Sequence, residues 1–280
     1  VGGDFTSWGG VAGRDYCACY DPNSSSWSDV GADNEFSAAV WALCFHPSGK
    51  LYIGGAFRDA GSGGDGDSLA QYVESTNTVS SVVAGCGDAG DFVTALAVDN
   101  SGNMVVGGLF LDWGDANGDF IVKWSGSALS SLGNGLTGSG SDKVFAVAVG
   151  KDNSYYAGGT FDDASSVANT KYIAKWNGSA WVSITPTEEA DSYITSLVTL
   201  PNGDIVAGGY FGKINADVDC NGIAIYNGAS WRPLGTAGVY GQVTGLSYSN
   251  RTGILYVNGP FTGTYDLSIT LGEGAGFNGS

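Results

Sequence analysis

The sequence is poor in basic residues, with 11 Lys and Arg against 28 Asp and Glu, and its net charge is −17. A surface this negative repels phosphate backbones and anionic lipids, so we expect neither nucleic acid nor an inserted membrane segment as a partner. No apolar run has the length that a transmembrane helix needs. The charge instead suits an outer surface in contact with solvent, or a surface that binds cations.

Histidine and cysteine are also scarce, which limits the catalytic chemistry. Ser-His-Asp catalysis would depend on His46, the single histidine, which lies in the turn-like phrase "FHPSGK". No nucleophile elbow and no phosphate-binding loop is present. The five cysteines include no CxxC pair, so a zinc ribbon is not indicated. We predict that the chain is not an enzyme. A carbohydrate-active enzyme that uses two carboxylates is the minor alternative.

A Gly-Gly-x-Phe phrase recurs along the whole chain. It reads "VGGDF", "IGGAF", "VGGLF", "AGGTF" and "AGGYF", and then decays to "VNGPF". The first position of the doublet falls at Gly2, Gly54, Gly107, Gly158, Gly208 and Asn258, at intervals of 52, 53, 51, 50 and 50. A short apolar run precedes each internal copy, and an aromatic-ended strand follows it, as in "IVKW" and "IAKW". This regularity indicates an internal repeat.

Each repeat offers four short strands, here called a, b, c and d in chain order. Four strands in about 50 residues are the pattern of a β-propeller blade, so we predict an all-β propeller of four-stranded antiparallel blades. The glycine doublet of strand b removes side chains where neighbouring sheets or backbones approach closely. The Asn177-Gly178 hairpin joins strands c and d, and we expect Trp176 and Trp181 on its two arms to pack between blades.

The phrases "GG-x-F" and "IAKWNGSAW" resemble the tandem propeller repeats of secreted proteins, cell-surface proteins and phage tail or fibre proteins. They are also similar, more loosely, to Kelch-type propellers, although Trp124 comes sixteen residues after Gly108, too late for that pattern. The resemblance implies a propeller used for recognition, scaffolding or assembly, at an extracellular, cell-surface or virion-surface location.

The number of blades is open at the sequence level. One propeller domain over residues 1–280 is predicted, with repeats at about 1–52, 53–105, 106–156, 157–206 and 207–256 and a partial repeat at 257–280. We favour six blades. A five-bladed ring, in which the strand from Val243 completes the first blade, and a segment of a longer array are the alternatives. "YDLSITL", residues 265–271, is a candidate third strand of the last blade.

The loops separate two faces of such a blade. The a–b and c–d turns are short, as in "PSGK" and "WNGS", whereas the b–c and d–a connections are long and acidic. Most of the carboxylates fall in these longer connections. We therefore expect function at the face that carries the b–c and d–a loops.

Calcium is the cofactor that these loops suggest. "DVDCNG" matches the opening of a calcium-binding loop, in which carboxylate and amide oxygens alternate, but Gly228 stands where the closing acidic ligand of an EF-hand would be. "DGD" and "DWGD" are looser matches. The alternative is a set of turns in which these side chains bond their own backbone. The candidate ligands are Asp217, Asp219 and Asn221, and more loosely Asp65, Asp67, Asp112 and Asp115.

Aromatic residues of the loops are candidates for stacking on sugar rings, with packing under a loop as the alternative role. These are Trp8, Trp113 and Tyr240. Four asparagines stand in N-glycosylation sequons, namely Asn23, Asn177, Asn250 and Asn278.

Together these features predict a non-catalytic recognition or adhesion module that binds a glycan or a protein receptor through the acidic loop face. The alternative is a structural subunit of a fibre, tail or surface assembly, which would bind copies of itself or other subunits through open edge blades.

Overall fold

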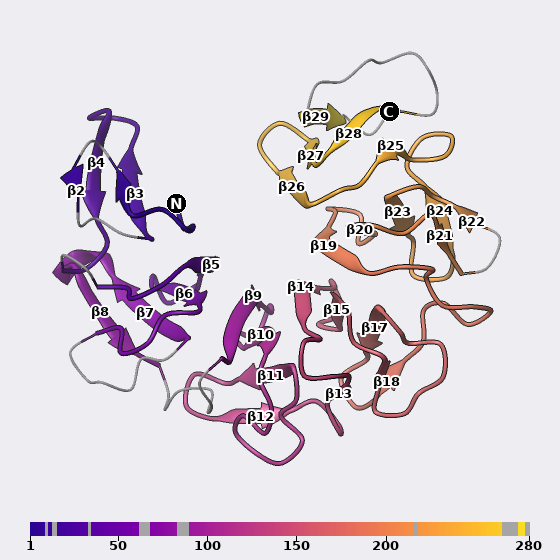
Figure 1. Cartoon of the computed structure of the whole chain (residues 1–280), viewed down its shortest axis with the longest axis horizontal. Helices are drawn as coiled ribbons and strands as arrows, with labels where there is room; N and C mark the ends of the chain where they lie inside the picture. Colours follow the sequence, from indigo (N-terminus) through magenta and orange to yellow (C-terminus); the bar gives the residue numbers. More distant parts are fainter. Residues whose placement is uncertain are drawn as a thin grey trace. The chain divides into compact units, whose positions relative to one another are not determined.

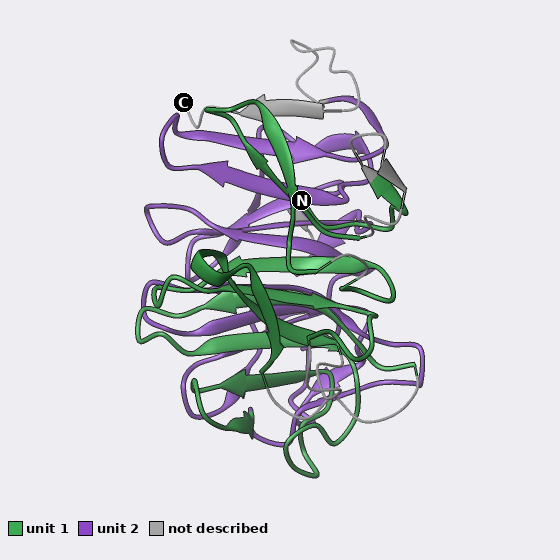
Figure 2. Cartoon of the chain, turned by 90° about the vertical axis from the view of Figure 1, so that its left-hand side faces the viewer, with its two compact units in different colours: residues 1–131 green, residues 132–280 purple. Residues whose placement is uncertain are grey.

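The structure is a computed structural model, and it describes residues 1–8, 11–12, 16–32, 35–61, 68–82, 90–215, 218–264 and 274–277. The chain divides into two compact units, residues 1–131 and 132–280 (Figure 2). The prediction of one domain over the whole chain stays a prediction. Across the described residues, no helix is both long and apolar enough to cross a membrane.

Four-stranded antiparallel sheets dominate both units, as the repeat predicts, and they follow one another along the chain (Figure 1). In each of them the strands pair in the order a, b, c, d. Unit 1 contains β5 (Val40–Phe45), β6 (Leu51–Gly55), β7 (Leu69–Val73) and β8 (Thr78–Ser81), then β9 (Phe92–Val98), β10 (Met104–Leu109), β11 (Ile121–Trp124) and β12 (Leu129–Ser131). Unit 2 contains β14 (Val144–Val149), β15 (Tyr155–Gly159), β17 (Ile173–Trp176) and β18 (Trp181–Val182), then β19 (Ile194–Thr199), β20 (Ile205–Gly209), β23 (Ile223–Tyr226) and β24 (Trp231–Pro233).

The first and last sheets have fewer strands. In the first sheet, β3 (Ala18–Asp21) pairs with β4 (Ser26–Asp29), and Gly2 forms an antiparallel bridge with Cys17. The last sheet has the order β26 (Gly245–Ser249), β27 (Ile254–Asn258), β29 (Gly274–Phe277). The strand that starts from the Val243 region, β26, pairs with β27 as its own strand b, so β27 is not left over as the five-bladed arrangement requires. The third strand is β29 rather than residues 265–271, which lie outside the described residues.

Short elements decorate the connections. Unit 1 has the pair β1 (Ser7–Trp8) and β2 (Val11–Ala12) and the 3₁₀ turn η1 (Glu74–Thr76). Unit 2 has β13 (Leu136–Thr137) paired with β16 (Asp163–Ala164), β21 (Lys213–Ile214) with β22 (Val218–Asp219), and β25 (Val239–Gly241) with β28 (Phe261–Thr264). Since β13 lies in a d–a connection and β16 in a b–c connection, their pairing confirms for this pair of loops that the two kinds of connection share a face.

The glycine doublet has two separate packing roles. The first glycine touches the β-branched residue that opens strand a of the following sheet: a Cβ on Gly208 would lie 2.5 Å from Cγ1 of Val243. The second glycine lies against the carbonyl of the residue before its own strand a, as Gly209 does with Tyr193. Any side chain at either position would displace a strand, which explains why the doublet recurs.

The tryptophans around the Asn-Gly hairpin are packing residues, as predicted. Gly178 has a φ of +101°, which its lack of a side chain permits, and Trp176 and Trp181 are both buried, with ring centroids 5.7 Å apart. The indole N–H of Trp181 donates to the carbonyl of Leu132, 2.7 Å away, just after the preceding sheet. Trp231 repeats this bond to the carbonyl of Ile184, also at 2.7 Å. In these two repeats the indole N–H thus bonds to the carbonyl of a residue 49 or 47 positions earlier in the chain.

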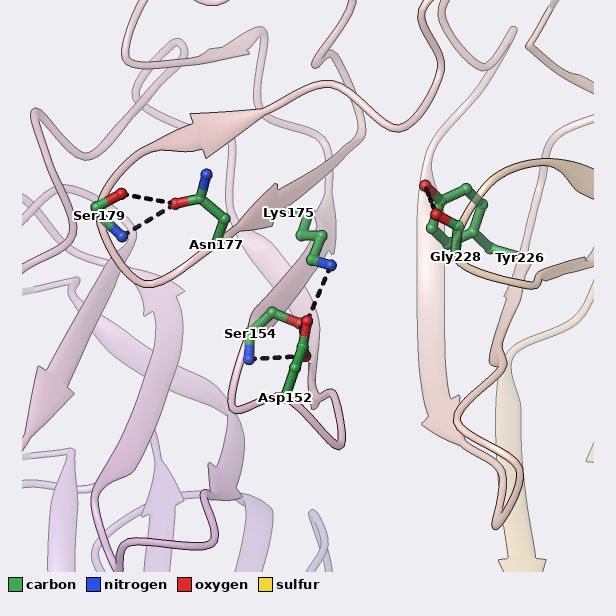
Figure 3. Close-up of polar contacts among 7 residues, drawn as sticks. All are labelled: Asp152, Ser154, Lys175, Asn177, Ser179, Tyr226 and Gly228. Carbon is green, nitrogen blue, oxygen red and sulfur yellow. Dashed lines mark hydrogen bonds and ion pairs between the residues drawn. The ribbon is translucent and has the colours of Figure 1, made fainter.

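The short turns on the other side are fixed by their own side chains (Figure 3). The Oδ1 of Asn177 accepts hydrogen bonds from the backbone N–H and the hydroxyl of Ser179, both at 3.0 Å. In the a–b turn, Asp152 accepts from Ser154 and lies 3.3 Å from the Lys175 ammonium. The Tyr226 hydroxyl donates to the Gly228 carbonyl at 2.9 Å. This side of the sheets is therefore built of compact, self-bonded turns.

Candidate functional site

A polar pocket opens among the acidic loops of unit 2, with a volume of about 390 Å³. Its wall is formed largely by the d–a connection between β18 and β19, with contributions from the b–c connections on either side. Both kinds of connection belong to the face on which the sequence predicts function. The lining residues are Asn169, Thr187, Glu188, Glu189, Ala190, Asp191 and Lys213.

Hydrogen bonds from the neighbouring b–c loops hold the pocket wall in place. The Nδ2 of Asn169 donates to the carbonyl of Pro186 at 2.9 Å, and the backbone N–H of Thr187 donates to Oδ1 of Asn215 at 3.0 Å. Because two consecutive residues just before Glu188 are bonded to other loops, the carboxylates of Glu188 and Glu189 are presented from a braced backbone.

Asp191 and Lys213 form the inner side of the pocket. Oδ1 of Asp191 accepts the backbone N–H of Gly212 at 2.8 Å, and the N–H of Asp191 donates to the carbonyl of Lys213 at 3.2 Å. The Lys213 ammonium lies 3.6 Å from Oδ1 of Asp219. The pocket therefore combines carboxylate acceptors with one ammonium and one amide, a donor and acceptor set suited to hydroxyl-bearing ligands.

A row of three aromatic rings continues from this inner side. Tyr193 and Tyr210 stack with centroids 4.6 Å apart at 25°, and Phe145 lies 6.0 Å from Tyr193. The N–H of Tyr210 donates to the carbonyl of Tyr193 at 3.0 Å, so the segments that carry Asp191 and Gly212 also carry the two tyrosines. All three rings are half-buried. The pocket is thus continuous along the chain with an aromatic surface.

A β-bulge positions Phe145. The pairing of β14 with β15 shifts register between Val144 and Ala146, which leaves Phe145 as the extra residue. Bulges re-aim side chains at the ends of strands and often occur beside functional sites. The Lys143 ammonium lies 5.3 Å from the centre of the Phe145 ring, a cation–π contact.

The titration of Tyr193 is perturbed. Burial raises the pKa of the Tyr193 hydroxyl above its ordinary value, and the nearby Tyr210 raises it further by charge and hydrogen bonding. The Tyr193 hydroxyl therefore stays protonated at neutral pH and is able to donate to a ligand oxygen.

The aromatic residues predicted from sequence are not those of the row. Trp113 is 4% exposed and packs edge-on against Phe110 with centroids 5.0 Å apart, so it fills the role of packing under a loop. Tyr240 is 42% exposed on β25. Trp8 belongs to β1, and its side chain lies outside the described residues. In the sequence, Tyr210 occupies the variable position of the Gly-Gly-x-Phe phrase, where the other full copies carry Asp, Ala, Leu or Thr. This departure from the other copies is the feature by which Tyr210 could have been found from sequence.

The predicted calcium ligands are placed only in part. Asp65, Asp67 and Asp217 lie outside the described residues. Asp115 accepts the backbone N–H groups of Asn117 and Ser131, which hold its pKa below the ordinary value. The N–H of Asp112 donates to Asp119. Asp115 therefore bonds its own loop, as the alternative predicts.

The remaining ligand candidates also have protein partners. Asp219 faces Lys213, and Nδ2 of Asn221 donates to the carbonyl of Ala237 at 2.9 Å. Within the described part of the chain, no three His, Cys, Asp or Glu side chains are grouped so that they could hold a metal ion. Among the described candidates, the carboxylate of Asp219 thus faces an ammonium, and that of Asp115 accepts backbone N–H groups.

Three sequon asparagines are exposed, namely Asn23, Asn177 and Asn250. Asn278 lies outside the described residues. Among the described cysteines, Cys17, Cys19, Cys44 and Cys220 are free thiols. Burial raises the pKa of Cys17 to about 11 and that of Cys220 to about 12, so these two are unreactive packing residues.

Comparison with known proteins supports the fold. No protein-family model matches the chain, and no curated protein matches its sequence. Similar solved structures include a calcium-binding protein, regucalcin, from Agrobacterium tumefaciens, with 12% identity, a TM-score of 0.54 and coverage of 86% of this chain and 73% of that one. Virginiamycin B lyase from Staphylococcus aureus has 10% identity, a TM-score of 0.54 and coverage of 86% and 69%. A gluconolactonase from Xanthomonas campestris has 12% identity, a TM-score of 0.51 and coverage of 86% and 75%.

These likenesses confirm a β-propeller of four-stranded antiparallel blades and match six-bladed members of that fold. The looser Kelch-type likeness is not confirmed. At such low identity the matches bear on the fold alone.

Proposed function

We propose that this chain is a non-catalytic recognition module that binds a glycan at the acidic pocket of unit 2. The pocket carries this proposal: it has a volume of about 390 Å³, lies on the loop face, and is lined by three carboxylates, an amide and an ammonium. Small-ligand sites are concave and offer a few fixed polar groups beside apolar surface. We assign the apolar surface to Tyr193 and Tyr210, which adjoin the lining residues Asp191 and Lys213 along the chain but do not line the pocket themselves.

A glycan fits this set of groups better than an anionic ligand does. Sugar hydroxyls donate to the carboxylates of Glu188, Glu189 and Asp191 and accept from the amide or the ammonium. Sugar rings also present C–H faces that pack on aromatic rings. The net charge of −17 disfavours sulfated or phosphorylated glycans, so we expect a neutral or amino-bearing sugar.

The proposed location is the outside of a cell or a virion. The resemblance to surface propeller repeats, the acidic composition and the three exposed sequon asparagines support it. The proposal includes a test for calcium at the loop that contains Asp219 and Asn221. If calcium contributes to binding, a chelator lowers the affinity for the glycan.

Binding to a glycan array, followed by calorimetry on the best sugar, tests the proposal. Glu188→Gln with Glu189→Gln should weaken binding about tenfold or more, because each lost charged hydrogen bond contributes about 1.5–3 kcal/mol. Tyr210→Ala should weaken it separately. Asp204→Asn is the matched control, since this carboxylate lies in the short turn between β19 and β20 and faces Arg232 at 3.9 Å.

Each alternative outcome has a clear meaning. Absence of binding to any sugar overturns the proposal. Release of product from a bound polysaccharide, abolished by the Glu188 and Glu189 changes, favours the carbohydrate-active enzyme instead. Filaments in the electron microscope favour the structural subunit.

A further inference from the structure

We propose that unit 1 contains a second glycan-binding site, formed by the aromatic rings of Trp41 and Phe92. The inference rests on the proposed function for the choice of a sugar as ligand, but the site shares no residue with the acidic pocket. Its evidence comes from comparing equivalent positions of the repeats, because three repeats carry at one of these positions a residue with a structural role.

The first of these positions is the extra residue of the β-bulge at the start of strand a. Trp41 takes this position on β5, and Phe145 takes it on β14. The other repeats carry threonine there, and its hydroxyl donates to the carbonyl of the first residue of the glycine doublet or its equivalent. The aromatic residues have no hydroxyl, so they give up a bond that the fold uses elsewhere. The threonines and their acceptors are Thr94 with Gly107 at 3.3 Å, Thr195 with Gly208 at 3.2 Å and Thr244 with Asn258 at 3.3 Å.

The second position is the residue just before strand a of the next sheet. Phe92 takes it after Trp41, and Tyr193 takes it after Phe145. The two repeats that follow a threonine carry a polar side chain there instead, namely Lys143 and Gln242. Aromatic residues therefore occupy both positions together or neither, which indicates that the two rings of a pair act together.

The two rings of each pair lie close together. Within each unit, strand a of one sheet lies beside strand a of the next, β5 beside β9 and β14 beside β19 (Figure 1). In unit 1 the ring centroids of Trp41 and Phe92 are 4.8 Å apart, and the rings meet edge to face at 80°. In unit 2 those of Phe145 and Tyr193 are 6.0 Å apart. Unit 1 thus repeats two members of the aromatic row that adjoins the acidic pocket of unit 2.

The surroundings of the unit 1 pair suit a sugar ring. Trp41 is exposed and Phe92 is half-buried, so both rings are in part accessible, and the C–H face of a sugar packs on such rings. The guanidinium of Arg58, in the b–c connection after β6, donates to the carbonyl of Asp91 at 3.1 Å, next to Phe92. A guanidinium carries five N–H donors, and sugar hydroxyls accept from such groups. The site therefore combines an apolar surface with polar donors.

The ligand of this site is a neutral or amino-bearing glycan, as for the pocket. The pair of rings is related by the repeat to the row beside the pocket, and the net charge of −17 disfavours anionic sugars here as well. The chain thus offers one glycan site in each unit, and we expect two binding events per chain.

The test titrates the full chain with four tetrasaccharides, those of glucose, galactose, N-acetylglucosamine and glucosamine. The NMR signal of the Trp41 indole N–H, assigned as the one that Trp41→Thr removes, should shift with at least one of them and saturate. Calorimetry with that sugar should give two sites per chain, and Trp41→Thr should leave one. This change introduces the residue of the other repeats, so the fold should be kept. Trp27→Thr is the matched control, since Trp27 is also an exposed tryptophan beside an aromatic ring, that of Tyr20 at 5.0 Å.

The pocket variant with Glu188→Gln and Glu189→Gln separates this inference from the proposed function. Removal of one site by the pocket changes and of the other by Trp41→Thr supports both. An unmoved Trp41 signal, or an equal loss with Trp27→Thr, overturns the inference while binding at the pocket stands. A shifted Trp41 signal with no effect of the pocket changes supports the aromatic site and overturns the pocket. If none of the four sugars shifts the Trp41 signal, the inference is wrong, and the glycan array decides the proposed function.

Discussion

The first sheet and the fifth sheet, β19-β20-β23-β24, are built from the same repeat but have different surroundings. In the fifth sheet, Gly209 lies against a backbone carbonyl, and Ile194, which opens strand a, is fully buried. In the first sheet, a Cβ on Gly3 would meet the Phe5 ring and no backbone atom, and Phe45 on the adjacent sheet is largely exposed. The comparison teaches that strand a covers both its own glycine doublet and the next sheet.

The strongest test of this difference replaces one large apolar residue in each region. Ile194→Ala should lower the free energy of unfolding by about 2–5 kcal/mol, because it leaves a cavity among fixed neighbours. Phe45→Ala should change it by only about 0.5 kcal/mol, because the ring is already in water. Chemical unfolding followed by circular dichroism measures both. Equal losses would mean that Phe45 is covered in solution.

The second test adds a methyl group to the second glycine of each doublet. Gly209→Ala should lower the stability by about 1–3 kcal/mol, since the new Cβ meets the Tyr193 carbonyl and the backbone has to shift. Gly3→Ala should cost much less, because no backbone lies against it. The same unfolding measurement applies. If Gly3→Ala is as harmful as Gly209→Ala, a strand occupies the edge of the first sheet.

A third test compares two buried indoles in complete sheets. Trp181→Phe should lower the stability by about 1–3 kcal/mol beyond the loss of packing, because the buried Leu132 carbonyl loses its donor. Trp124→Phe removes an indole N–H that has no hydrogen-bond partner among the described residues, so it should lack this additional loss. The difference between the two melting temperatures isolates the link between sheets. Equal shifts would show that the bond contributes little.

The smallest effect concerns the a–b turn between β14 and β15. The Ser154 hydroxyl and backbone N–H, helped by the Lys175 ammonium, hold the pKa of Asp152 below its ordinary value of 3.8. A carboxyl with a lowered pKa stabilises the fold above that ordinary value, and the contribution is lost as the pH falls through the lower, folded-state pKa. Asp152→Asn should therefore make the loss of stability below pH 3.8 shallower. An unchanged acid profile would contradict this.

The repeat made much of the fold predictable. The doublet, the apolar strand before it and the aromatic strand after it correspond to b, a and c of each complete sheet, because burial and backbone spacing act locally along each strand. Trp176 and Trp181 were correctly predicted to be packing residues. The third strand of the last sheet was assigned wrongly, since "GAGF" has few side chains from which a strand could be recognised.

The sequence predicted the loop face on which the candidate site lies, but not the residues that form the site. The acidic loops indicated where to look, and the pocket lies there. Trp113 was a reasonable ligand-binding candidate by residue type, but its ring fills the space under its own loop. Tyr193 and Tyr210 lie in segments that are separate in sequence, and only the hydrogen bonds between those segments bring their rings together.

The sequence alone determined the strand repeat, the segregation of charge to one set of loops and the type of turn at each hairpin, because these depend on neighbours within a few residues. The tertiary structure decided which carboxylates share a pocket with Lys213, which aromatic rings stack and which apolar side chains remain in water. These outcomes depend on contacts between sheets and between loops that are about twenty to fifty residues apart in sequence, and strand pairing and inter-sheet packing fix such contacts.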